Sequence, residues 1–379
     1  MRKLKLRSQI ITLIIMVMLV ATILSGCGKD TSNNNDRNTH GNIDNEAIDS
    51  ETKVTDEIDE IENADETDNI AEYSDTDKGS DDKIEIKIAA LKGPTGMGMV
   101  KMMEDAENGT AANDYKFTVV GEADVVSTGL IKGDFDIAAV PCNLASVLYN
   151  KTEGQIKIAA INTLGVLYIV ETGNEITTVE DLRGKTIYST GYGTTPQYTL
   201  NYLLSINGID PEKDVNIEYK TESTEVAALL ENSTDAIAML PQPYVTTVMM
   251  NNDKVRIALD IEKEWTEQNQ DGSGVVTGVV VVNKEFLEKN PEAVESFMAE
   301  YNESAKFVND NIDQAAQLIE KFEIFKAAVA KKAMPYCNIT FIRGQEMKTK
   351  VEAYLNVLYN QNPKAIGGTM PAEDFYYVQ

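Results

Sequence analysis

The sequence predicts an α/β protein with two lobes, each a mainly parallel sheet flanked by helices. Three observations lead to this prediction. From residue 83 onward, short apolar or β-branched runs alternate with helical periodicities. The alternation comes in two successive series, and a strongly β-branched run at 275–282 follows the second. Residues 83–379 also form a stretch long enough for one large or two smaller hydrophobic cores.

The first 27 residues have the order of a secretory signal. A basic stretch precedes an apolar run at 10–24, which ends in Leu24-Ser25-Gly26-Cys27. This run is shorter than the roughly 20 residues that a spanning helix needs, so we prefer a cleaved signal to a retained anchor. The last four residues resemble the lipobox of bacterial lipoproteins. That resemblance implies that Cys27 becomes the lipid-bearing first residue of a protein on the outer face of the cell membrane, with a plain cleaved signal as the alternative.

Residues 28–82 are expected to form a disordered acidic tether. The stretch 29–82 has 19 Asp and Glu against four Lys and Arg, and so carries −15 of the formal net charge of −27. It contains no Pro, Phe or Trp. The rest of the chain shows no basic patch, so we expect no binding to nucleic acid.

Histidine and cysteine content limits the chemistry of the body at 83–379. The only histidine, His40, lies in the tether, which excludes Ser-His-Asp and Cys-His catalysis and histidine-based zinc sites in the body. We therefore expect no catalytic residue, no metal and no cofactor. Cys142 and Cys337 could form a disulfide in an exported protein, but nothing in the sequence indicates one.

The first series opens with an alternating-to-apolar run, a turn of glycine and proline, and a helical pattern. Strands are expected at 83–91, 115–120, 135–140 and 156–161, helices at 97–106, 123–131 and 144–149, and turns at 92–96 and 141–143. Strands that alternate with helices favour parallel pairing.

The second series repeats this order of helix, strand and polar or proline turn. Extended segments or strands are expected at 166–171, 186–188, 215–219, 236–239 and 255–259, helices at 178–182, 196–206, 224–231 and 244–250, and turns at 189–195 and 241–243.

The last third begins with a polar loop at 262–274 and a buried strand at 275–282. Amphipathic helices are expected at 284–309, 312–321, 324–332 and 344–358. If 164–171 and 275–282 are the two crossings between lobes, the first lobe comprises 83–168 and 276–379, and the second comprises 169–275.

Three motifs carry a family resemblance. They are Lys132-Gly133-Asp134-Phe135-Asp136-Ile137-Ala138, the segment 178–187 with Leu182-Arg183-Gly184-Lys185, and the small-residue turn 191–196 after an extended 164–170. In this order they resemble the solute-binding proteins of ABC importers, more narrowly the nitrate, sulfonate, taurine and thiamine-precursor branch. The resemblance covers about 83–309. It implies a two-lobed type II periplasmic binding protein that closes on a small solute between its lobes and delivers it to a membrane permease with an ATPase.

Four turns are candidates for the solute site, because ligands of open α/β sheets lie beyond the carboxyl ends of the strands. The residues expected to contact the solute are Lys92, Gly93, Pro94, Thr95, Gly96, Met97, Pro141, Cys142, Asn143, Tyr192, Gly193, Thr194, Thr195, Gln242, Tyr244 and Thr277. Backbone N–H groups at the start of a helix can bind an anion or a carbonyl oxygen. An amide side chain can both donate and accept, and tyrosine faces pack against rings.

Each of these turns has a purely structural alternative. Gly93-Pro94 forms a tight turn in any case, and Thr194 and Thr195 are good helix caps before Pro196. The two tyrosines could pack at the surface or between the lobes. Cys142 is better explained as a small apolar residue than as a nucleophile.

The sequence thus predicts a monomeric binding protein whose partners are a small-molecule solute, a membrane permease with its ATPase, and the bilayer that holds its lipid anchor. Lys92 is the only basic residue in the four turns, so a multiply charged anion is not expected. A mono-anionic sulfonate or carboxylate and a neutral ring such as a pyrimidine both remain open. The alternatives are a lipoprotein that senses a ligand for a membrane partner and an extracytoplasmic enzyme on the same fold, whose histidine-rich chemistry this body lacks.

Overall fold

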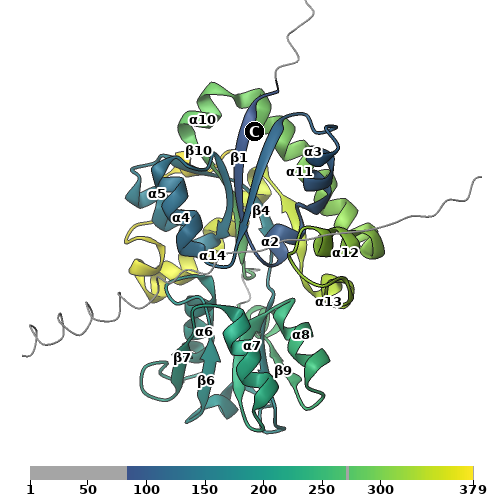
Figure 1. The fold of residues 1–379 in the computed structure, drawn as a ribbon. Coiled ribbons are helices and arrows are strands. Elements are labelled where there is room, and N and C mark those ends of the chain that lie inside the picture. The colour runs from purple at the N-terminus through teal and green to yellow at the C-terminus, as the bar shows by residue number, and fades with distance from the viewer. Residues whose placement is uncertain (1–82, 270–272, 379) are drawn as a thin grey trace, which may run out of the picture. The chain divides into compact units, whose positions relative to one another are not determined.

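The computed structural model describes residues 83–269 and 273–378, which form two lobes, each built on one sheet (Figure 1). The expected signal segment, Cys27, the tether and His40 lie outside the described residues. The strands of the first lobe are β1 (Glu85–Leu91), β2 (Asp114–Val120), β3 (Ile137–Pro141), β4 (Ile156–Thr163), β10 (Gly278–Asn283) and β11 (Ile339–Ile342). Those of the second lobe are β5 (Leu167–Glu171), β6 (Thr186–Ser189), β7 (Asn216–Tyr219), β8 (Ile237–Pro241) and β9 (Arg256–Asp260).

Helices flank both sheets. The first lobe carries α2 (Pro94–Met97), α3 (Val100–Glu107), α4 (Ala123–Lys132), α5 (Cys142–Lys151), α10 (Lys284–Lys289), α11 (Pro291–Asp310), α12 (Ile312–Lys321), α13 (Ala327–Ala333) and α14 (Gly344–Gln361). The second lobe carries α6 (Thr195–Ile206), α7 (Ser223–Asn232) and α8 (Tyr244–Asn251), and α9 (Ile261–Gln268) follows its last strand. Single 3-10 turns occur at η1 (Val179–Leu182), η2 (Met334–Tyr336), η3 (Pro363–Ile366) and η4 (Glu373–Phe375).

The two-lobed α/β fold predicted from the sequence is confirmed, but the sheets are mixed rather than mainly parallel. The first sheet has the order β11-β4-β10-β3-β1-β2, and β10 lies antiparallel between β3 and β4. The second has the order β7-β6-β8-β5-β9, with β5 antiparallel to both of its neighbours. Two of the reversed strands, β5 and β10, follow the connections between the lobes, because a chain that crosses into a lobe enters its sheet from the end where the other strands stop. The third, β11, runs antiparallel to β4 at the edge of the first sheet.

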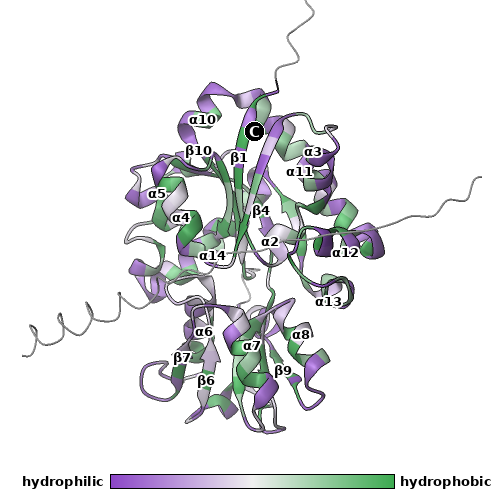
Figure 2. Cartoon of the chain, in the orientation of Figure 1, coloured by the Kyte–Doolittle hydropathy of each residue, from purple (hydrophilic) through white to green (hydrophobic). Residues whose placement is uncertain are grey.

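Alternating side chains of β5 and β10 build the cores. On β10, Val280 and Val282 belong to one hydrophobic cluster of the first lobe, and Val279 and Val281 belong to the other. All four side chains are at most 1 % exposed. Because both faces of the strand are buried, its sequence is a continuous run of valines, whereas a half-buried strand would alternate apolar with polar residues. On β5, Leu167 and Ile169 face one cluster of the second lobe, and Tyr168 and Val170 the other. Figure 2 shows the hydrophobic residues on the central strands and the hydrophilic ones on outer faces such as that of α10.

Several segments differ from the sequence prediction. The turn expected at 92–96 runs into the short helix α2, and the helix expected at 97–106 is α3, which begins only at Val100. Part of the loop expected at 262–274 is the helix α9, which begins at Ile261 because the carboxylate of Asp260 accepts hydrogen bonds from the backbone N–H groups of Glu262 and Lys263. The helix expected at 284–309 is broken into α10 and α11 by Pro291, which begins the second one. The short strand β11 was not expected.

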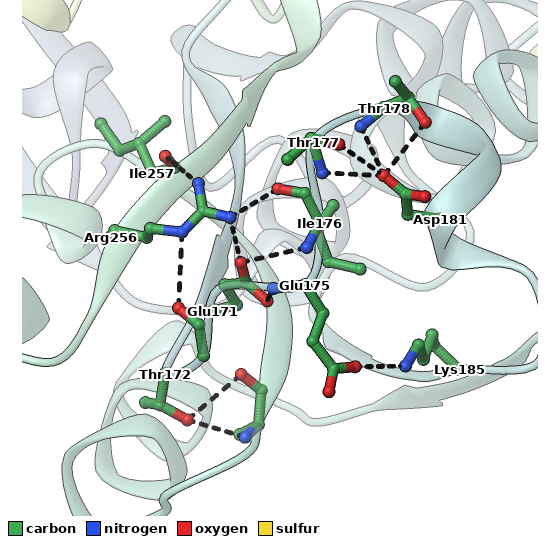
Figure 3. Close-up of polar contacts among 12 residues, drawn as sticks. Glu171, Thr172, Glu175, Ile176, Thr177, Thr178, Asp181, Lys185, Arg256 and Ile257 are labelled. Atoms are coloured by element: carbon green, nitrogen blue, oxygen red, sulfur yellow. Dashed lines mark hydrogen bonds and ion pairs between the residues drawn. The ribbon is translucent and has the colours of Figure 1, made fainter.

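A buried carboxylate and a partly exposed guanidinium form an ion pair in the second lobe (Figure 3). The carboxylate of Glu171, with a side chain 2 % exposed, pairs with Arg256. The same carboxylate accepts from the backbone N–H groups of Ile176 and Glu175, each at 3.2 Å, and Arg256 Nη2 donates to the carbonyl of Ile176 at 2.6 Å. These bonds attach the loop after β5 to the edge strand β9.

Cys142 and Cys337 are free thiols in the structure, each buried in a different cluster of the first lobe. Burial raises the pKa of both thiols, so both remain protonated near neutral pH. Within residues 83–269 and 273–378, no helix has the length and apolar content needed to cross a bilayer.

Candidate functional site

The candidate site is a cavity of about 520 Å³ between the two sheets, within the range of small-molecule sites. Its walls come from residues that follow β1, β2 and β3 in the first lobe and β6, β7 and β8 in the second. Thr163 at the end of β4 and the first residues of β5 and β10 close it at the lobe connections. The cavity therefore lies where the carboxyl ends of the like-directed strands of both lobes meet.

Most of the sequence-predicted residues line this cavity. They are Lys92, Gly93, Pro94, Thr95, Pro141, Tyr192, Thr194, Thr195, Gln242, Tyr244 and Thr277. They come from all four expected turns and from the segment before β10. Whether they contact a solute remains a prediction.

Five of the expected residues do not line the cavity. Gly96 and Met97 are buried inside α2, where a Cβ on Gly96 would lie 2.9 Å from the carbonyl oxygen of Leu91. Cys142 is fully buried in the core, in agreement with its interpretation as an apolar residue. Asn143 and Gly193 contact each other instead, as described next.

A polar contact joins the lobes beside the cavity. Asn143 of α5 donates through Nδ2 to the carbonyl of Gly193 at 3.2 Å and accepts through Oδ1 from the hydroxyl of Thr195, also at 3.2 Å. Asn143 is fully buried and also donates to the carbonyl of Ala365 at 2.9 Å. Thr194 occupies the cap position of α6, but its hydroxyl donates to the carbonyl of Gly191 rather than accepting from a helix amide.

The inner wall of the cavity carries neutral polar groups. Gln242 is 2 % exposed, and its Oε1 accepts from both the N–H and the hydroxyl of Thr246, at 3.2 and 2.7 Å. Its Nε2 has no acceptor among residues 83–269 and 273–378, and the hydroxyls of Thr163 and Thr277 are likewise unpartnered there. Buried polar groups are normally hydrogen-bonded, so the Gln242 amide is available to a bound molecule.

Charged residues gather at the mouth of the cavity, and only one of them, Lys92, was expected from the sequence. Besides Lys92, the lining contains Glu122 and Asp124 at the start of α4, and Lys220 and Glu222 before α7. The strands and helices on either side of these two segments were predicted correctly, and both segments follow the carboxyl end of a strand. Because ligands lie beyond the carboxyl ends of strands, both segments could have been predicted as parts of the site. Neither segment contains a proline, the residue that marked three of the four predicted turns.

The two tyrosines occupy different depths. Tyr192 is 74 % exposed at the mouth and packs edge-on against Tyr219, with ring centroids 5.3 Å apart. Tyr244 is half-buried and packs edge-on against Phe325 of the first lobe at 5.1 Å. Burial, with a smaller effect from the charge of Glu222, raises the pKa of Tyr244 to about 12, so its phenol keeps its proton at neutral pH.

The two connections between the lobes meet at one carboxylate. Glu262 of α9 accepts from the N–H of Val275 at 2.9 Å in the second connection. In the first connection, a Cβ on Gly165 would lie 2.4 Å from Glu262 Oε2, and a Cβ on Gly274 would lie 2.7 Å from Oε1. Glycine at both positions therefore allows the carboxylate to fit between the connections.

Helix α9 also ties the two cores together. Ile261 belongs to a core cluster of the second lobe, whereas Trp265, one turn later, is fully buried in the first lobe. The Trp265 ring packs against Tyr202 of α6 and Tyr354 of α14, with centroid distances of 4.4 and 5.5 Å. The hydroxyls of Thr199 and Tyr354 are 2.8 Å apart, which adds a hydrogen bond between the lobes.

Comparison with known proteins agrees with this architecture. Residues 156–315 match the family model described as NMT1/THI5 like. A crystal structure of an ABC transporter protein from Parabacteroides distasonis has 24 % identity and a TM-score of 0.65, with 78 % of this chain and 99 % of that chain covered. No curated protein matches the sequence.

Two sulfonate-binding proteins share the fold at lower identity. The aliphatic sulphonate binding protein SsuA from Escherichia coli has 16 % identity and a TM-score of 0.61, covering 75 % of this chain and 96 % of that one. The alkanesulfonate-binding protein SsuA from Xanthomonas axonopodis pv. citri, bound to MOPS, has 13 % identity and a TM-score of 0.60, covering 73 % and 93 %. Residues 156–315 are therefore similar to the NMT1/THI5-like family, and the chain shares the two-lobed fold of these periplasmic binding proteins of ABC transporters.

Proposed function

We propose that this protein is the extracytoplasmic solute-binding component of an ABC importer, which captures a small organic solute and passes it to a membrane permease. The observation that carries this proposal is the cavity, to which both lobes contribute residues at the carboxyl ends of their strands. Its wall offers a free amide donor at Gln242 and several hydroxyls. These groups suit reversible recognition, so we propose binding without chemistry on the solute.

Capture requires that the solute favour the closed arrangement of the lobes. A ligand that touches both walls stabilises the closed state by its differential affinity for that state. The lobes would move about the two connections at Gly165 and Gly274, which flank Glu262. The contacts of Asn143 with Gly193 and Thr195 would form and break with this movement.

The charges in the cavity limit the class of solute. Lys92 and Lys220 are balanced by Glu122, Asp124 and Glu222, so a multiply charged anion would meet net repulsion. A mono-anionic sulfonate or carboxylate, or a pyrimidine-like ring packed on Tyr244, fits the proposal better. The sulfonate-binding proteins with this fold support the first of these classes by analogy alone.

A thermal-shift screen tests the proposal. The purified full-length chain is melted with sulfonates, carboxylates, pyrimidines and amino acids, and at least one compound is expected to raise the melting temperature. A ligand at one hundred times its Kd adds about 2.7 kcal/mol to the free energy of unfolding. A strain that lacks the protein should also lose uptake of that compound. Absence of any stabilising compound would contradict solute binding, and binding without an effect on uptake would favour the sensing role.

The lipid anchor is a separate part of the proposal. We expect the mature chain to begin at Cys27 and to carry lipid there, so that the acidic segment 28–82 links the membrane to the lobes. Mass spectrometry of the protein isolated from membranes should give a lipid-modified N-terminal peptide. An intact Met1, or an unmodified residue after cleavage, would refute the anchor.

A further inference from the structure

We propose that Glu222 selects solutes that carry a cationic amino group. This inference rests on the proposed function and narrows its substrate class to those small organic solutes that carry an amino group besides any acidic or ring group. It starts from the position of Glu222, the residue before α7 and a part of the cavity wall. Glu222 Oε2 accepts from the hydroxyl of Thr224 at 3.0 Å. Its Oε1 faces the other lobe, since a Cβ on Gly121 would lie 3.0 Å from it.

The carboxylate of Glu222 has no cationic partner in the described part of the chain. Lys220, two residues earlier, is paired instead with Glu218 at 3.3 Å and lies over the ring of Tyr188. Glu122 and Asp124 on the opposite wall also form no ion pair with any described lysine or arginine. Three unpaired carboxylates thus face a mouth in which Lys92 is the one unpaired cation among the described lining residues.

Closure over a solute would remove water from this mouth. A carboxylate that loses its water needs a positive partner or several hydrogen-bond donors, and an anion placed beside it is repelled. An ammonium group on the solute supplies both the charge and the donors. A sulfonate at the same position would have to overcome the charge of Glu222.

The amide nitrogen of Gln242, unpaired among the described residues, supports ligand binding at this wall independently of Glu222. It is almost fully buried, its oxygen is held by Thr246, and its Nε2 has no described acceptor. Gln242 and Glu222 both line the cavity, so one solute can meet both. The complementary molecule presents an acceptor oxygen or nitrogen to Gln242 and an amino group to Glu222.

An acidic residue at a helix N-terminus also stabilises the helix itself, whatever the ligand. Glu225 in the first turn of α7 provides the matched control. It accepts from the N–H of Glu222 at 3.0 Å, it belongs to the same helix end, and it is not part of the cavity wall. A role in the helix alone predicts similar behaviour for Glu222→Gln and Glu225→Gln.

The test uses three compounds that share a ring and an amide acceptor: 4-(aminomethyl)benzamide, 4-(hydroxymethyl)benzamide and 4-carbamoylbenzenesulfonate. Their Kd values for the full-length chain and both variants are measured by titration calorimetry. The amine should bind at least about tenfold tighter than the alcohol, the usual scale for a charged hydrogen bond, and the sulfonate should bind most weakly. Glu222→Gln should remove the preference for the amine, and Glu225→Gln should retain it. Equal melting temperatures of the variants show that folding is intact.

The possible outcomes separate this inference from the proposed function. An equal loss of affinity for all three compounds in Glu222→Gln would mean that the residue only holds the lobes together, and would overturn the inference. Tighter binding of the sulfonate, or stabilisation only by compounds without an amino group, would overturn it as well. If no compound of any class stabilises the chain, the proposed function itself fails.

Discussion

Replacement of Glu171 by alanine is expected to lower the free energy of unfolding by about 1–3 kcal/mol, the usual cost of leaving buried hydrogen-bond donors without an acceptor. The carboxylate is almost completely buried, and it holds the guanidinium of Arg256 and the backbone N–H groups of Glu175 and Ile176 (Figure 3). Its loss leaves these donors without their acceptor. Urea unfolding of the full-length chain, followed by circular dichroism, measures the change.

The control for this prediction is Glu175→Ala in the same loop. Glu175 pairs with Lys185 at 2.6 Å, but both side chains are exposed, and exposed pairs contribute little to stability. The urea midpoint of this variant should stay close to that of the parent chain. Similar midpoints for Glu171→Ala and Glu175→Ala would show that the buried carboxylate of Glu171 does not hold the second lobe together.

Replacement of Gln242 by leucine is expected to weaken solute binding by about tenfold to a hundredfold, the effect of leaving a buried polar group of the ligand unpaired. The substitution removes Nε2, the donor that lines the cavity without a described acceptor. Calorimetric titration with the most stabilising compound of the screen gives the change in Kd.

The variant Thr246→Val separates the loss of the Nε2 donor from a general disturbance of the structure around Gln242. It deletes the hydroxyl that donates to Gln242 Oε1 but leaves the backbone N–H of residue 246, which also donates to that oxygen. This variant should lose some stability and keep most of its affinity. A leucine variant with the Kd of the parent chain would exclude Gln242 from the site.

The order of strands and helices could be predicted because the chain alternates between two clear periodicities. The direction of strand pairing could not, because it depends on where the chain crosses between lobes. β5 and β10 are reversed for this reason, although their valine and isoleucine content is that of any buried strand. Helix α9 was missed because six charged or polar residues surround Ile261 and Trp265, whose spacing of four residues was the only apolar signal.

The candidate site was predictable where turns carry glycine or proline and much less so elsewhere. Residues such as Gln242 and Thr95 were found because strand ends converge in this fold. The carboxylate of Glu222 was missed because no turn signal marks the end of β7. Asn143 was expected at the solute, but its amide joins the lobes, a role that depends on a second segment 50 residues away.

Trp265 gives the protein a built-in optical probe. It is the only tryptophan of the chain, and it lies between Tyr202, on a helix of one lobe, and Tyr354, on a helix of the other. Any rotation of the lobes that changes its distance to Tyr202 should alter the wavelength or intensity of indole emission. Stopped-flow fluorescence could therefore follow the proposed opening and closing of the lobes in the native chain without an attached dye.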